Sequence, residues 1–123
     1  MLKAPQDITP FVLTDQPTPV ELLSKYFRAF ADPTRLQILE LVADQERSVG
    51  ELVELTGQAQ PKISNHLACL RWCGFVSTRR QHRRMYYSVA DPRVTELIEI
   101  ARGLLGDSAL EVSCCSVLAR EDD

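Results

Sequence analysis

The sequence of 123 residues predicts a mainly α-helical fold with one β-hairpin, the winged helix-turn-helix arrangement. Three observations predict it: helix-start signals recur along the chain, two short helical segments are joined by a turn of about four residues, and two strand-like runs follow directly. The length fits one domain, and a content of 45% hydrophobic and 25% charged residues is typical of a globular protein. A multidomain enzyme and a wholly disordered chain are therefore excluded.

Residues 1–18 contain three prolines and no sustained periodicity, so we expect an N-terminal arm there. The first helix is expected after Thr18, because Thr18 and Glu21 form a capping-box pattern and Pro19 suits the first helical position. An apolar stripe at helical spacing follows, unusually aromatic for a short terminal helix; it consists of Leu22, Leu23, Tyr26, Phe27 and Phe30.

Two further helices are predicted between residues 32 and 57. Asp32 followed by Pro33 combines an N-cap with a first-turn proline, and the helical pattern continues to about residue 43. Ser48 and Glu51 repeat the capping-box pattern, which predicts a short third helix ending at Gly57.

A fourth helix and a hairpin complete the predicted motif. Pro61 opens the helix, which runs to about Cys73 with Gly74 at its C-terminal end. The runs 75–80 and 85–89 are rich in residues that favour strands, and the basic stretch 81–84 connects them. The expected wing is therefore a hairpin with a cationic tip.

The last helix begins at Asp91-Pro92 and is expected to end at Gly106, where its apolar face ends. The elements together predict a winged-helix domain over residues 19–106. A C-terminal tail is predicted over residues 107–123, and it contains Cys114 and Cys115.

Charge is segregated along this sequence. The net charge is -3, but residues 55–90 contain no Asp or Glu and carry +6, which leaves -9 on the remainder. A basic cluster of this kind is typical of a segment that binds nucleic acid, so the acidic total does not argue against a DNA partner.

The fourth helix and the hairpin supply the candidate DNA contacts. Successive helical residues are about 100° apart, so Ile63, Leu67 and Leu70 face the body while polar side chains point elsewhere. Amide side chains can pair with adenine, a lysine with guanine or phosphate, and arginines with phosphates. The alternative is that the arginine-rich hairpin is only a solvated surface. The predicted DNA-binding residues are Gln60, Lys62, Ser64, Asn65, His66, Arg71, Arg79, Arg80, Arg83 and Arg84.

The sequence shows neither an apolar run of the roughly 18 residues that a membrane span needs nor the pattern of a signal peptide, so a cytoplasmic protein is expected. Cytoplasmic thiols stay reduced, and the cysteines should be free, metal-bound or redox-active rather than paired in structural disulfides. They are Cys69, Cys73, Cys114 and Cys115.

Cys69 and Cys73 are four residues apart on the fourth helix, which places them about 40° apart around its axis and one turn apart along it. Two thiolates in this arrangement can bind one ion. Thiolates select soft ions, here Hg²⁺, Cd²⁺, Pb²⁺ or arsenite, and exclude hard ions such as Mg²⁺. The alternative is that these cysteines pack as small hydrophobic side chains.

Three stretches resemble the ArsR/SmtB family of metal-responsive repressors: Phe27–Leu39 (FRAFADPTRLQIL), Ile63–Arg71 (ISNHLACLR) and Gly74–Val76. The resemblance extends from about Val20 to Leu105. It implies a homodimer whose first and last helices form the interface, and whose two recognition helices bind a roughly palindromic operator.

The stretch His66–Gly74 (HLACLRWCG) resembles the cadmium- and lead-sensing CmtR branch of this family. There the matching cysteines bind metal together with a cysteine from the C-terminal region of the other subunit. The resemblance therefore implies that Cys69, Cys73 and either Cys114 or Cys115 are metal ligands.

Two other metal sites of the family are not matched in this sequence. Ser48 and Gly50 occupy the cysteine positions of the arsenic-type site, and Arg93 and Leu104 occupy the histidine positions of the zinc-type site.

The resulting hypothesis is a repressor that binds operator DNA as an apo homodimer and is released when Hg²⁺, Cd²⁺ or Pb²⁺, or less favourably arsenite, binds the thiolates. One alternative is a repressor switched by cysteine oxidation; here the adjacent Cys114 and Cys115 are the better pair, because cysteines one helical turn apart are poorly placed for a disulfide. A thiol enzyme is disfavoured, because the sequence has no Gly-rich phosphate loop and no Cys-x-x-Cys.

Overall fold

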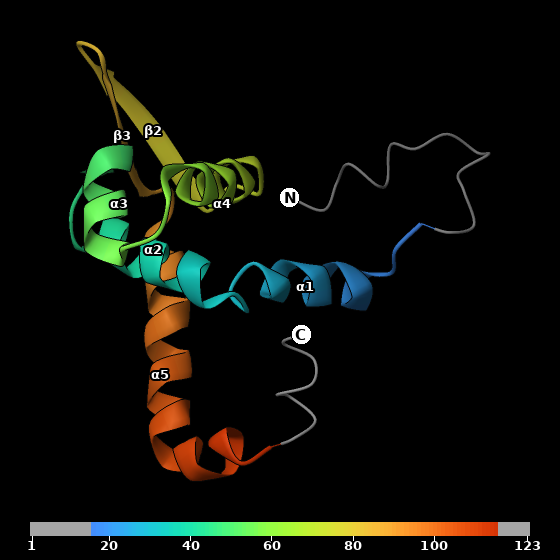
Figure 1. Ribbon diagram of the computed structural model, residues 1–123. Helices are drawn as coiled ribbons and strands as arrows, with labels where there is room; N and C mark the ends of the chain where they lie inside the picture. The colour runs from blue at the N-terminus through green and yellow to red at the C-terminus, as the bar shows by residue number, and fades with distance from the viewer. Residues whose placement is uncertain (1–15, 116–123) are drawn as a thin grey trace.

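The computed structural model describes residues 16–115 and confirms a mainly helical fold with a small antiparallel sheet (Figure 1). The hairpin projects from one end of the molecule, and the free end of α5 extends from the opposite end. The elements, in order along the chain, are α1 (Pro19–Arg28), α2 (Pro33–Asp44), β1 (Arg47–Ser48), α3 (Val49–Thr56), α4 (Gln60–Trp72), β2 (Val76–Gln81), β3 (Arg84–Val89) and α5 (Pro92–Ser113).

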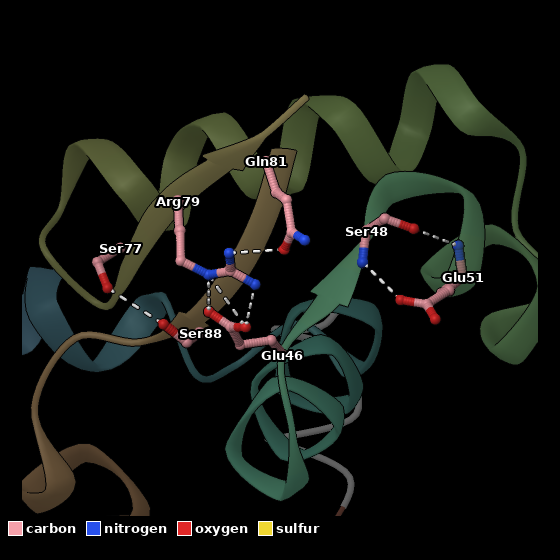
Figure 2. A network of polar contacts seen from close by, with 7 residues as sticks. All are labelled: Glu46, Ser48, Glu51, Ser77, Arg79, Gln81 and Ser88. Atoms are coloured by element: carbon pink, nitrogen blue, oxygen red, sulfur yellow. Dashed lines mark hydrogen bonds and ion pairs between the residues drawn. The ribbon is translucent and has the colours of Figure 1, made fainter. Parts of the chain in front are cut away.

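Both predicted capping boxes form. At α1, the Glu21 amide donates to Thr18 Oγ1 (3.1 Å) and the Thr18 amide donates to Glu21 Oε1 (2.8 Å). Ser48 and Glu51 make the same reciprocal pair at α3, with distances of 3.2 and 2.8 Å (Figure 2). Each box satisfies two backbone N–H donors that the start of a helix would otherwise leave free, which explains why both helices begin where the sequence predicts.

The two predicted Asp-Pro helix starts are confirmed as well. Asp32 accepts the Arg35 amide at 3.0 Å at the start of α2, and Asp91 accepts the Arg93 amide at 2.9 Å at the start of α5. The turn between α3 and α4 contains Gly57 at φ +73°, a left-handed conformation that favours glycine. The helix-turn-helix is therefore built from local signals.

The sheet has one strand more than the sequence predicts. Its order is β1-β3-β2, with Arg47 opposite Tyr87 and Ser48 opposite Tyr86. A strand of two residues shows no alternation, and its pairing with β3 joins residues far apart in the chain, so no local pattern indicates it. The hairpin strands also extend to Gln81 and Arg84, which makes the turn at the tip shorter than the predicted connection 81–84.

The predicted end of the last helix at Gly106 is wrong. α5 continues to Ser113, but it is kinked close to the predicted end, at the non-helical residue Ser108 (φ -135°, ψ 25°), whose hydroxyl donates to the Leu104 carbonyl at 3.2 Å. A glycine inside a helix costs only about 1 kcal/mol relative to alanine, and the residues after Gly106 can continue the helix. Cys114 therefore directly follows the helix. The division into arm, domain and tail stays a prediction, since residues 1–15 and 116–123 lie outside the described part.

The hydrophobic core lies between α2, α3, α4 and the start of the hairpin, and the first turns of α5 close it. Phe75 is completely buried and its ring lies 4.6 Å from that of Tyr26 and 4.9 Å from that of Phe30, centroid to centroid. These aromatic contacts attach α1 to the body. The most buried large side chains are Phe75, Ile38, Leu39, Leu52, Ile63, Leu67 and Leu70.

Large apolar side chains remain exposed on α1 and on the outer part of α5, the two helices that lie apart from the body in Figure 1. Apolar surface of this extent on a small domain indicates a surface that another molecule covers. The exposed residues are Val20, Leu23, Tyr26, Phe27, Ile100, Leu104, Leu105, Leu110 and Val112. Within residues 16–115, no helix combines the length and the apolar character that crossing a membrane requires.

Replacing Phe75 by alanine is expected to lower the free energy of unfolding by roughly 3–5 kcal/mol, because the change removes a fully buried ring and leaves a cavity. Urea unfolding at a fixed protein concentration measures this loss. Trp72→Ala is the control: Trp72 is 91% exposed and the change should stay within roughly 0.5 kcal/mol. Equal losses in the two variants would contradict this account of the core.

Candidate functional site

The buried side of α4 is the side that the helical spacing predicts. Ile63, Leu67 and Leu70 are buried against the body. The predicted DNA contacts Gln60, Lys62, Ser64, Asn65 and Arg71 are all exposed. α4 follows the Gly57 turn and is thus the second helix of the helix-turn-helix, which in this motif enters the DNA groove. Its exposed polar residues form the surface that can face the DNA.

His66 differs from the other predicted contacts on α4, because its side chain points toward the body and is only 16% exposed. Its Nε2 lies 3.6 Å from Asp32 Oδ2, and its Nδ1 lies 3.5 Å from a guanidinium nitrogen of Arg35. Burial lowers the pKa of His66; Asp32 opposes this shift, while the positive charges of Arg35 and Lys62 add to it. The geometry places His66 at the edge of the core, and a direct DNA contact for it stays a prediction.

Arg79 is held within the wing by an acidic partner (Figure 2). Its guanidinium makes contacts of 2.7 and 3.0 Å with the two carboxylate oxygens of Glu46, donates to Gln81 Oε1 at 2.8 Å, and lies 5.1 Å from the ring centroid of Tyr86. The Arg79 guanidinium lowers the pKa of the Glu46 carboxyl. A phosphate contact by Arg79 must therefore compete with Glu46.

Arg80, Arg83 and Arg84 are exposed at the tip of the hairpin. In residues 16–115 none of the three forms an ion pair with a carboxylate. The tip projects well beyond the body (Figure 1), so these three guanidinium groups are available to phosphates. Sequence reasoning missed Glu46, because β1 brings its neighbourhood to β3 through a long-range contact.

Cys69 lies in the last turn of α4 and Cys73 is the C-cap residue of the same helix, and both cysteines are exposed. The Cys73 amide donates to the Cys69 carbonyl at 3.0 Å at the end of the helix. Burial raises the pKa of the Cys73 thiol and the neighbouring Cys69 side chain raises it further, while Lys25 and Arg35 oppose the shift. The two thiols are thus close enough to act on each other and accessible to an ion.

A groove of about 490 Å³ lies beside Cys73, between α1 and the first turns of α5. Its walls are mostly apolar and include Leu22, Leu23, Tyr26, Val94 and Leu97. Cys73 therefore adjoins the two helices whose outer faces are exposed and apolar.

Cys114 and Cys115 lie at the end of α5, directly after the helix. All four cysteines are free thiols. Within one chain, residues 16–115 bring together no group of three His, Cys, Asp or Glu side chains that could hold a metal ion. The structure thus assembles the first predicted pair of ligands but does not add either terminal cysteine to it from the same chain.

A helix-turn-helix with an exposed polar second helix and a basic hairpin defines a winged helix-turn-helix DNA-binding protein. Residues 32–78 match the family model described as a bacterial regulatory protein of the arsR family. The chain is 45% identical to the probable mercury resistance operon repressor of Streptomyces lividans over 100 residues, which cover 81% of this chain and 80% of that protein. The chain belongs to the arsR family and is a transcriptional regulator.

Two further comparisons agree with this membership. The transcriptional regulator CmtR of Mycobacterium bovis is 37% identical over 82 residues, which cover 63% of this chain and 70% of that protein. The homodimeric winged helix-turn-helix DNA-binding domain Mb0332 from the same organism matches with a TM-score of 0.66 at 28% identity, covering 77% of this chain and 92% of that one. The resemblance seen in the sequence is confirmed.

Replacing Glu46 by glutamine is expected to strengthen DNA binding at low salt and to steepen its salt dependence by about one phosphate contact, because Arg79 loses its negatively charged partner. Fluorescence anisotropy over a range of KCl concentrations measures both, using a duplex that the wild-type protein selects from random sequences.

Asp44→Asn is the matched control for this prediction. It changes the net charge equally but breaks the ion pair of Asp44 with Arg47, which is not a wing residue. If the two variants have the same salt slope, Arg79 does not reach DNA when freed.

Proposed function

We propose that this protein is a metal-sensing transcriptional repressor. Its apo homodimer binds operator DNA, and it is released when a thiophilic ion, Hg²⁺, Cd²⁺ or Pb²⁺, binds Cys69, Cys73 and a cysteine at the end of α5. Arsenite is a weaker candidate. The observation that carries the proposal is the adjacent thiol pair on the same helix that presents the predicted DNA contacts.

The exposed apolar residues of α1 and α5 support the homodimer. Side chains such as Phe27 and Leu104, 47% and 67% exposed, gain stability when a second copy covers them. The similar domain from Mycobacterium bovis is described as homodimeric. A two-fold dimer would present two α4 helices to two half-sites of a palindromic operator.

The chemistry of the thiols supports a soft ion. Two thiolates one helical turn apart offer sulfur ligands only, and sulfur ligands discriminate strongly against Mg²⁺ and Ca²⁺. Because one described chain offers no third ligand near the pair, Cys114 or Cys115 of the second copy would complete the site. Among the candidate ions, Hg²⁺ is favoured by the similarity to the probable mercury resistance operon repressor.

Release follows from where the ligands lie. An ion that joins Cys69 and Cys73 to the end of the other copy's α5 would constrain α4, whose exposed residues read the operator. DNA and metal would then favour different positions of one helix, which is the condition for coupling between two ligands. Such couplings are typically about 1–3 kcal/mol, or a roughly 5–150-fold loss of operator affinity.

Titration of the protein–operator complex with Hg²⁺, Cd²⁺ and Pb²⁺ is expected to release the DNA from the wild type but not from Cys69→Ser or Cys73→Ser, because serine does not replace a thiolate ligand. Gel shifts measure release, and ultraviolet sulfur-to-metal charge-transfer bands report the number of bound thiolates. Operator complexes of the wild type that survive all three ions and arsenite would refute the proposal.

Cys114→Ser and Cys115→Ser are matched controls for each other in this titration. The two residues are adjacent, and the proposal needs one of them as third ligand. One variant should lose a charge-transfer band and respond weakly, and the other should resemble the wild type. If neither change affects the bands, the third ligand is not a terminal cysteine.

A redox switch is the second candidate, and the observation that favours it is the pair of adjacent free thiols after α5. Hydrogen peroxide would convert the two thiols to a disulfide, and two electrons and two protons would pass to the peroxide to give water. With a chelator present, the metal hypothesis predicts that mild peroxide does not release the operator. Release together with the loss of two titratable thiols would favour the redox switch instead.

A further inference from the structure

One polar cluster joins three helices at the centre of the molecule. We define the Asp32 cluster as the side chains of Asp32, Arg35 and His66 with the carbonyl groups of Arg28 and Ala29. Arg35 Nε donates to the Ala29 carbonyl at 3.0 Å, and its NH2 donates to the Arg28 carbonyl at 2.9 Å. Arg35, at the start of α2, thereby binds the C-terminal end of α1, where free carbonyls favour a positive charge.

Asp32, the N-cap residue of α2, and Arg35 also contact His66 on α4. Asp32 Oδ2 accepts the Arg35 amide and faces His66 Nε2 at 3.6 Å, while Arg35 faces His66 Nδ1 at 3.5 Å. A neutral imidazole with its proton on Nε2 suits both neighbours, since it presents N–H to the carboxylate and a lone pair to the guanidinium. His66 is the residue of α4 that enters this cluster.

These contacts differ in kind from the apolar contacts of α4. Ile63, Leu67 and Leu70 bury one side of the helix, but apolar burial is non-directional and tolerates small rotations or shifts along the axis. Hydrogen bonds and charge contacts depend on distance and angle. The position of Asn65 and Ser64 relative to the rest of the molecule is therefore set most sharply by the neighbouring His66.

We infer that Asp32 and Arg35 are positioning residues for DNA recognition, which fix the rotation of α4 by holding His66 against the C-terminal end of α1. Neither side chain needs to touch DNA for this role. The inference does not depend on a metal ion. It does bear on release, because His66, Cys69 and Cys73 lie on one face of α4 at spacings of three and four residues.

The charges around His66 give the cluster a pH dependence. Burial is the main cause that lowers the pKa of His66; Arg35 and Lys62 lower it too, and Asp32 raises it. The folded protein thus favours the neutral ring, whose contacts are intact above the ordinary value of about 6.5 and are lost as pH falls below it. A protonated ring would place an N–H against the Arg35 guanidinium.

The test compares Asp32→Asn with Asp91→Asn in the full chain, without metal. Asparagine is as good an N-cap as aspartate, so Asp32→Asn keeps the cap of α2 but loses the charge that faces His66 and Arg35. Asp91 caps α5 and pairs with Arg93 at 2.8 Å, so Asp91→Asn makes the same chemical change away from α4. Anisotropy measures affinity for the selected duplex and for a random-sequence duplex between pH 5.5 and 8.

Asp32→Asn is expected to bind the selected duplex about tenfold more weakly at pH 7.5, with its affinity for random duplex equal to that of Asp91→Asn. Specificity should fall because base contacts need a fixed helix, whereas phosphate contacts of the wing do not. In the wild type the specificity ratio should decline below about pH 6.5, and in Asp32→Asn the remaining decline should move to lower pH. A general loss of structure would not move this midpoint.

Arg35→Lys is the second variant and keeps the inference testable if Asp32→Asn is unstable in urea. Lysine keeps the charge but has no planar fork to span two carbonyls and the imidazole, so the same loss of specificity is expected. A wild-type specificity ratio in folded Asp32→Asn or in folded Arg35→Lys, at every pH, would overturn the inference.

Discussion

The burial of one side of α4 is the constraint on which the rest of the structure depends. Ile63, Leu67 and Leu70 are almost completely buried, and the helix has only 13 residues. When this stripe packs against α2 and α3, the geometry of the helix directs Lys62, Ser64 and Asn65 toward solvent. The packing that forms the core therefore also exposes the polar residues of α4 that are predicted to contact DNA.

The attachment of α1 and α5 follows from the same core. Phe75 begins the hairpin immediately after α4, and its buried ring packs on Tyr26 and Phe30. Val94 and Ile98 add the first turns of α5, whereas the remainder of that helix leaves its apolar side chains exposed. Within a single chain, the buried residues fix the position of α4. The exposed apolar side chains of α1 and of the outer part of α5 remain available to a second copy. The uncovered helices α1 and α5 also line the groove beside Cys73, at the end of α4.

Most of the fold could be predicted because its helices start at signals within a few neighbouring residues. The features that could not be predicted are contacts between residues far apart in the sequence. The caps at Thr18, Asp32, Ser48 and Asp91 act within three residues, so a single sequence reveals them. The spacing of Cys69 and Cys73 is local for the same reason. In contrast, the partner of Arg79 lies 33 residues away and that of His66 lies 31 residues away on α2, and no periodicity reports such pairs. The prediction that the last helix ends at Gly106 was wrong because a glycine marks a helix end only when the residues after it do not continue the helix.

Electrostatics link the proposed metal site to the DNA surface. Burial and the neighbouring Cys69 raise the pKa of Cys73, so the resting thiol is protonated and adds no negative charge to the helix that approaches the phosphates. If a soft divalent ion were bound by three thiolates as proposed, it would displace their protons, and the complex would carry a net charge of about -1. That charge would repel the DNA backbone in addition to any movement of α4. A weakly thiophilic ion cannot displace the thiol protons as effectively, so the environment that keeps the Cys73 thiol protonated also favours soft ions over hard ones.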